Sequence, residues 1–149
     1  MINKTAPFPQ ANDFQKIISI INIDKVDKLK DYSSMCVYLG DISPRQVDYY
    51  LAACIYLGLV NEEKEFTETG FHLHMLGATE QMAELARYII SDEIFGTVYF
   101  RQKLLGFDLD LDDVMDIMKE HVSFDSEAMY RRRASTVMSW VRWIDQNVG

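Results

Sequence analysis

The chain has 149 residues, a length that suits one medium-sized domain or two very small ones. With 7 glycines and 3 prolines its composition excludes collagen-like and low-complexity proteins, and no apolar run reaches the length of a membrane span. The net charge of −8 argues against a protein that coats nucleic acid through bulk electrostatics.

The first residues and the cysteine content both bear on location. The opening stretch has neither the basic region nor the apolar core of a secretion signal. Two cysteines, Cys36 and Cys54, are too few for a disulfide scaffold and suit a reducing compartment. We therefore expect a cytoplasmic protein without membrane association.

Taken in chain order, the first elements are short helices. Asn12 or Asp13 is placed to cap a helix over residues 14–21, whose isoleucines recur at helical spacing. Residues 24–31 indicate a polar connector or a weak helix. A short apolar helix over residues 32–39 is then predicted to end at Gly40.

A better-marked helix follows, and after it the pattern changes. Ser43 is a favourable N-cap and Pro44 occupies the first helical position, where its missing N–H has no partner to lose. Residues 59–60 and 65–67 read as two short strands around the polar turn of residues 61–64.

This order of elements predicts a fold class. Helix, short helix, turn, capped helix and small β-hairpin is the order of a winged helix-turn-helix, with the hairpin as the wing. We expect that unit to span residues 1–76.

The second half is expected to be helical throughout. A helix is predicted from a cap at Thr79, a second from Ser91-Asp92 to a stop at Gly106, and a third over residues 111–120. Ser123 or Asp125 is placed to cap a long final helix. Residues 77–149 are thus predicted to form a helical, helix-turn-helix-like unit that packs on the first and shares its core. The fold class is mainly α.

The C-terminal segment is the only part without an acidic excess, because residues 125–149 carry four arginines against three carboxylates. Arg131, Arg132 and Arg133 open the last helix and are candidates for phosphate contacts in DNA. Three adjacent residues spread widely around a helix, so at least one is expected to pack inward or pair with an acid. The alternative is an intramolecular network of ion pairs with the acidic residues 108–116.

The helix after Pro44 presents a second group of candidates. Arg45, Gln46 and Tyr49 lie on its expected outward face, and Arg and Gln can read guanine and adenine edges. Asp48 on the same helix would repel phosphate. The alternative for this group is an ordinary solvated helix face.

No constellation of catalytic residues stands out. His72 and His74 would project to one side of a strand and could suit a metal, but no Cys-x-x-Cys spacing or further ligand set supports it. Glycine-rich phosphate loops, nucleophile elbows and HExxH motifs are absent from the sequence. We expect no metal, no cofactor and no enzymatic activity.

Three segments carry a resemblance to a known family: Phe8–Phe14, Ile42–Tyr50 and the run Arg132–Ile144, which reads RRASTVMSWVRWI. In this order they resemble a family of bacterial winged-helix domains that stand alone or are appended to type II restriction-modification proteins. They resemble less closely the paired winged-helix extension of some nitrate-type transporter ATPases. The first resemblance implies DNA binding or a DNA-directed accessory role and supplies no catalytic residue.

Two functions remain open at this point. The first is an accessory or regulatory protein that binds double-stranded DNA, in a setting such as restriction-modification. The second is a protein-interaction module that binds a protein partner or a second copy of itself and no nucleic acid. The net charge of −8 and the exposed-looking Tyr49, Tyr56 and Trp143 favour the second.

Overall fold

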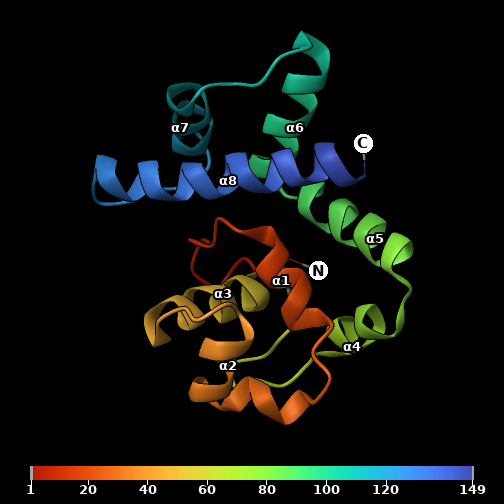
Figure 1. The fold of residues 1–149 in the computed structure, drawn as a ribbon. Helices are drawn as coiled ribbons and strands as arrows, with labels where there is room; N and C mark the ends of the chain where they lie inside the picture. Colours follow the sequence, from red (N-terminus) through yellow and green to blue (C-terminus); the bar gives the residue numbers. More distant parts are fainter. Residues whose placement is uncertain (1, 149) are drawn as a thin grey trace.

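The computed structural model describes residues 2–148 and shows helices joined by short connections. The helical segments are α1 (Phe14–Ile21), the 3₁₀ turn η1 (Val26–Lys30), α2 (Tyr32–Tyr38), α3 (Pro44–Tyr56), α4 (Glu68–Met75), α5 (Ala78–Ile90), α6 (Glu93–Leu105), α7 (Leu111–Lys119) and α8 (Glu127–Asn147). Figure 1 shows α8 running across the molecule, with α1 to α4 below it and α6 and α7 above it.

Capping residues fix several helix ends at the positions that the sequence predicts. The Asp13 side chain accepts a hydrogen bond from the backbone of Gln15 and starts α1. Ser43 starts α3 through a capping box, with Pro44 at the first helical position. Asp92 starts α6, and Gly106, with φ of 79°, ends it in the left-handed conformation that glycine adopts without strain.

The predicted winged helix-turn-helix is wrong, because the two expected strands do not form. Within residues 2–148 they are reduced to one antiparallel bridge between Val60 and Phe66. The chain leaves the extended conformation at once, since the Thr67 hydroxyl accepts a hydrogen bond from the Gly70 amide and caps α4. The same hydroxyl donates to the carbonyl oxygen of Gly58 at 2.6 Å. A helix therefore occupies the place of the second strand, and no wing projects.

Other predicted positions also need correction. His72 and His74 lie on helix α4 and not on a strand. Gly77, two residues before the predicted Thr79, is the N-cap of α5. Ser126, rather than Ser123 or Asp125, caps α8.

The core is one continuous cluster that reaches from the N-terminal segment to the last helix. Phe14 of α1 packs on both tryptophans of α8, at ring-centroid distances of 5.2 Å to Trp140 and 4.3 Å to Trp143. Phe8, from the segment before α1, stacks on Phe95 of α6 at 5.6 Å. The N-terminal segment thus lies between the helices below and those above.

The length and hydropathy of the helices bear on whether any of them could span a membrane. None of them, within the residues that the structure describes, combines the length and the hydropathy needed to cross a bilayer.

Candidate functional site

The segment before α1 is held against α8 by three hydrogen bonds. The backbone N–H of Ala11 donates to the Thr136 hydroxyl at 3.1 Å, and that hydroxyl donates to the Asn12 side-chain oxygen at 2.7 Å. The indole N–H of Trp140 donates to the Ala11 carbonyl oxygen at 2.7 Å. Because Thr136 and Trp140 are fully buried, these bonds fix residues 10–12 beside the first half of α8.

The same segment is also tied to α3. The backbone N–H of Asp13 donates to the Tyr50 hydroxyl at 3.0 Å. The first turn of α3 is rigid because Ser43 and Gln46 cap each other reciprocally, at 3.2 and 3.3 Å. Residues 10–13 therefore bridge the middle of α3 and the middle of α8, two elements far apart in the sequence.

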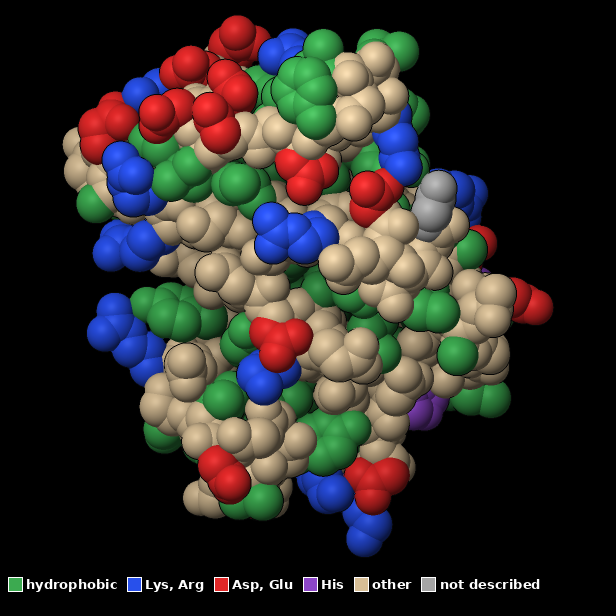
Figure 2. All heavy atoms as spheres, turned by 45° about the horizontal axis from the view of Figure 1, so that its top comes forward, with side chains coloured by type: hydrophobic (Ala, Val, Ile, Leu, Met, Phe, Trp, Pro, Cys, Tyr) green, Lys and Arg blue, Asp and Glu red, His purple; other side chains and the backbone are tan. Residues whose placement is uncertain are grey.

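A groove of about 450 Å³ lies where these three pieces of chain meet. Its lining consists of Gln10, Asn12, Arg45, Gln46, Tyr49, Tyr50, Arg132 and Ser135. All eight residues fall within the three segments Phe8–Phe14, Ile42–Tyr50 and Arg132–Ile144. Figure 2 shows Lys and Arg side chains on both sides of an indentation at the left edge of the molecule, where Figure 1 places one end of α3 and of α8.

The arginines at this groove have no acidic partner. Among residues 2–148, eight side chains form ion pairs with a carboxylate within 4 Å, and Arg87 is the only arginine among them. The predicted alternative of an ion-pair network between Arg131–Arg133 and residues 108–116 does not form. The guanidinium groups of Arg45 and Arg132 therefore stay available to an external anion.

Arg45 is oriented by its own helix. Its Nε donates to the Tyr49 hydroxyl at 3.0 Å, and its guanidinium lies 5.6 Å from the centre of the Tyr49 ring. This contact holds the side chain along the groove while leaving the two terminal nitrogens for a ligand. Gln46 is less free, because its side-chain oxygen accepts the bond that completes the capping box.

Of the three adjacent arginines, only Arg132 lines the groove. Arg131 is exposed on α8 outside the groove lining. Arg133 turns inward, with its guanidinium 4.7 Å from the centre of the Phe124 ring and one nitrogen donating to the Met129 carbonyl oxygen at 3.1 Å. Burial, and then the positive charge of Arg132, lower the pKa of Arg133. The expectation that one of these arginines packs inward is thus confirmed for Arg133.

Acidic side chains near the groove face elsewhere. Asp48, the residue expected to repel phosphate, accepts a hydrogen bond from the Tyr32 hydroxyl of α2 and does not line the groove. Lys64 donates to the same hydroxyl at 2.7 Å, so a cation stands close to this acid. Figure 2 shows red side chains gathered at the upper left, the part of the molecule where α7 lies, and not around the indentation.

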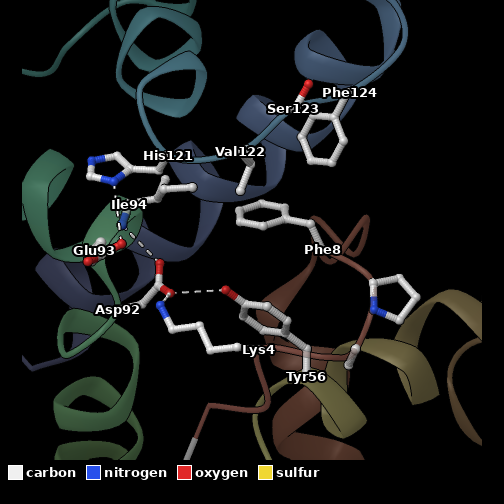
Figure 3. Close-up of a pocket in the computed structure, with 12 residues that line it drawn as sticks. Lys4, Phe8, Tyr56, Asp92, Glu93, Ile94, His121, Val122, Ser123 and Phe124 are labelled. Carbon is white, nitrogen blue, oxygen red and sulfur yellow. Dashed lines mark hydrogen bonds and ion pairs between the residues drawn. The ribbon is translucent and has the colours of Figure 1, made fainter.

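A second cavity, of about 460 Å³, surrounds the buried Asp92 at the start of α6 (Figure 3). Asp92 is 4% exposed, and its Oδ1 accepts from the Tyr56 hydroxyl at 3.1 Å and from Lys4 Nζ at 3.2 Å. Its Oδ2 accepts from the backbone N–H groups of Ile94 and Phe95. These four donors occupy both carboxylate oxygens, and we interpret Asp92 as a cap that joins α3, α6 and the N-terminal segment.

Two other polar groups of this cavity, the Tyr56 hydroxyl and the His121 ring, also lie beside a carboxylate. Burial, and then the neighbouring Asp92 carboxylate, raise the pKa of the Tyr56 hydroxyl above its ordinary value. His121 Nδ1 lies 3.4 Å from a Glu93 oxygen, at the rim shown in Figure 3.

The histidines considered as metal ligands have other roles. His74 Nδ1 lies 2.7 Å from the Ile21 carbonyl oxygen, and its ring packs against Phe66 and Phe71. Over the described part of the chain, no three His, Cys, Asp or Glu side chains converge as a metal site requires.

The structure thus brings together four of the six predicted DNA-contact residues: Arg45, Gln46, Tyr49 and Arg132. Sequence reasoning missed the other lining residues, Gln10, Asn12, Tyr50 and Ser135, as members of a site. The sequence signal that could have found them is the set of three segments quoted for the resemblance, because each of these segments contributes residues to the groove.

The fold and the groove define an all-helical protein with a cationic groove between elements that are distant in the sequence. The model of the family described as "Domain of unknown function (DUF7226)" matches residues 15–148, and the chain belongs to this family. No curated protein and no solved structure matches the chain significantly.

Proposed function

We propose that this protein binds double-stranded DNA through the groove between α3 and α8. The observation that carries the proposal is the convergence of Arg45 and Arg132, both without an acidic partner, on one groove of a protein with a net charge of −8. With 23 carboxylates in the chain, arginines that stay unpaired on both sides of a groove favour an anion as the ligand.

The lining suits the backbone of a polynucleotide. Arginine forms two parallel hydrogen bonds with a phosphate group, and we assign this contact to Arg132, which lines the groove from α8. Gln10, Asn12 and Ser135 add neutral side chains that can donate to phosphate oxygens. Arg131, exposed on the adjacent surface of α8, extends the cationic region outside the groove.

Base contacts are assigned to the start of α3. Arg45 is exposed at the groove and is held by the half-buried Tyr49, so Arg45 is the residue best placed to reach a guanine edge. Gln46 contributes less, because its oxygen is used in the capping box. The overall negative charge implies an affinity that depends on this local cationic surface and falls steeply with salt.

We further propose that such binding serves an accessory or regulatory role, in a setting such as restriction-modification. In that role the protein acts in the cytoplasm and carries no catalytic residue of its own. Arg133 takes no part in our proposal as a direct contact, because its guanidinium is turned onto Phe124.

Fluorescence anisotropy with a short fluorescent duplex at low salt tests this proposal. We expect Arg45→Ala and Arg132→Ala each to weaken binding about tenfold, equivalent to about 1.4 kcal/mol. Each lost phosphate contact should also lower the slope of log affinity against log salt by about one.

The matched control is Arg142→Ala, which removes an exposed arginine of the same helix that likewise has no carboxylate within 4 Å among residues 2–148. Circular dichroism of each variant shows whether the helices are retained. Absence of duplex binding at low salt overturns the proposal, and so does an equal loss in all three variants.

A further inference from the structure

The outer surface of α6 is unusually apolar for a face with no neighbour in the chain. Four large hydrophobic side chains within eight residues are exposed: Phe100 (54%), Leu104 (88%), Leu105 (49%) and Phe107 (62%). Exposed hydrophobic side chains that gather in one place mark a contact surface, whereas scattered ones need no explanation. The hollow beside this surface is separate from the arginine groove, because the two have no lining residue in common.

Two of these four side chains, Phe100 and Leu104, belong to a single stripe of α6. Glu93, Thr97, Phe100, Arg101 and Leu104 follow one another at intervals of three, four and one residues, so they share one side of the helix. Beside the stripe is an open hollow of about 450 Å³, which Ile90 at the end of α5 and Gly96 also line. The stripe therefore offers both a projecting side chain, Leu104, and a hollow able to receive one.

The charges at the two ends of this stripe are opposite. Glu93 lies in the first turn of α6, and Arg101 lies eight residues later on the same side. Within the described residues Arg101 has no carboxylate within 4 Å, and Glu93 approaches only His121. An acid at one end and a base at the other make the stripe complementary to an antiparallel copy of itself.

We propose that two copies of the chain pair through α6 about a two-fold axis near Thr97. In an antiparallel pair centred on residue 97, Glu93 of one copy faces Arg101 of the other, and the contact occurs twice. Leu104 of each copy then lies over Ile90 of the other and fills the hollow beside it. A second copy therefore covers the apolar stripe and pairs both charges at once.

The size of the surface sets the strength of the pair. One helix stripe and its hollow make a small interface, so we expect the dimer to form in a concentration-dependent equilibrium. DNA binding by the groove does not depend on this pairing, and either proposal can fail alone.

Sedimentation equilibrium of the whole chain over a range of concentrations tests the pairing. We expect a reversible monomer–dimer equilibrium that Leu104→Asp weakens by at least about tenfold, because a carboxylate would be buried in an apolar hollow. The control is Val37→Asp, which changes another well-exposed apolar side chain (70%, against 88% for Leu104) on α2. A monomer at every concentration overturns the proposal, as does equal weakening by both variants.

A charge exchange distinguishes this two-fold pair from any other self-association. Glu93→Arg and Arg101→Glu should each weaken the dimer, since like charges then face each other twice. An equimolar mixture of these two variants should form heterodimers, because both contacts become attractive again. The chain carrying both substitutions should regain the wild-type association. If the mixture associates no better than the separate variants, the antiparallel pairing is wrong.

Discussion

Thr136 illustrates how one side chain organises the candidate site. Its hydroxyl accepts from the Ala11 backbone and donates to the Asn12 side chain, inside a fully buried environment. Asn12 itself lines the arginine groove. A residue in the middle of the RRASTVMSWVRWI run therefore holds the groove lining in place without touching a ligand.

Replacing this hydroxyl by a methyl group should be costly. Thr136→Val keeps the side-chain volume but leaves the buried Ala11 N–H without an acceptor. We expect the free energy of unfolding to fall by about 1–3 kcal/mol, measured by urea denaturation. The neighbouring Ser135→Ala is the control, because its hydroxyl donates only to the Arg131 carbonyl oxygen of the same helix. Equal stability of the two variants would contradict this role of Thr136.

At the scale of elements, the connection between α3 and α4 determines that no wing forms. Leu59 lies directly against α4, since a Cβ added at Gly70 would come within 2.0 Å of the Leu59 carbonyl oxygen. The Leu59 carbonyl also accepts from the Thr67 backbone at 3.0 Å. Close docking of helix backbone on residue 59 leaves no space for the strands to lengthen.

This docking makes a specific prediction for Gly70. Alanine ordinarily favours a helix over glycine by about 1 kcal/mol, yet here its methyl group would press on backbone that cannot rotate away. Gly70→Ala should therefore lower the free energy of unfolding by about 1–3 kcal/mol in thermal or urea denaturation.

Gly77 provides the comparison for Gly70, because the space around the two glycines differs. At Gly77 an added Cβ meets no atom within 4 Å, and the α5 N-cap there has no side-chain hydrogen bond. Gly77→Ser should accordingly be neutral or stabilising by a few tenths of a kcal/mol. A neutral Gly70→Ala variant would show that α4 can move away from Leu59.

For the whole molecule, the central fact is that one core joins both halves of the chain. The N-terminal segment contributes Phe8 and Phe14 to contacts with α6 and α8, and Trp140 closes the cluster with a hydrogen bond to Ala11. The buried apolar residues of the helices below α8 and of those above it belong to this one cluster, with α8 between the two groups (Figure 1).

We therefore expect the chain to unfold in one cooperative step. Tryptophan fluorescence reports α8, which holds both tryptophans, and far-UV circular dichroism reports all the helices. The two transitions should coincide in urea, and a fragment of residues 1–76 alone should lack stable helix. A separate helical transition before the change in fluorescence would contradict this coupling.

The sequence by itself determined several helix ends and the mainly helical content. Asp13, Ser43 with Pro44, Asp92 and Gly106 act on backbone groups within a few residues, so their effect can be read without knowing the fold. It also identified Arg45 and Arg132 as candidate DNA-contact residues, because residue type and helical spacing are local properties.

Only the tertiary structure decided that residues 59–67 make no wing, that Arg133 faces Phe124, and that the Thr136 hydroxyl holds Asn12 beside Arg132. Each of these outcomes depends on how elements pack together rather than on neighbours along one helix. Close packing between elements selects one arrangement among several that short-range preferences allow. The groove exists for the same reason, since its sides come from residues 10–12, 45–50 and 132–135, which only the shared core brings together.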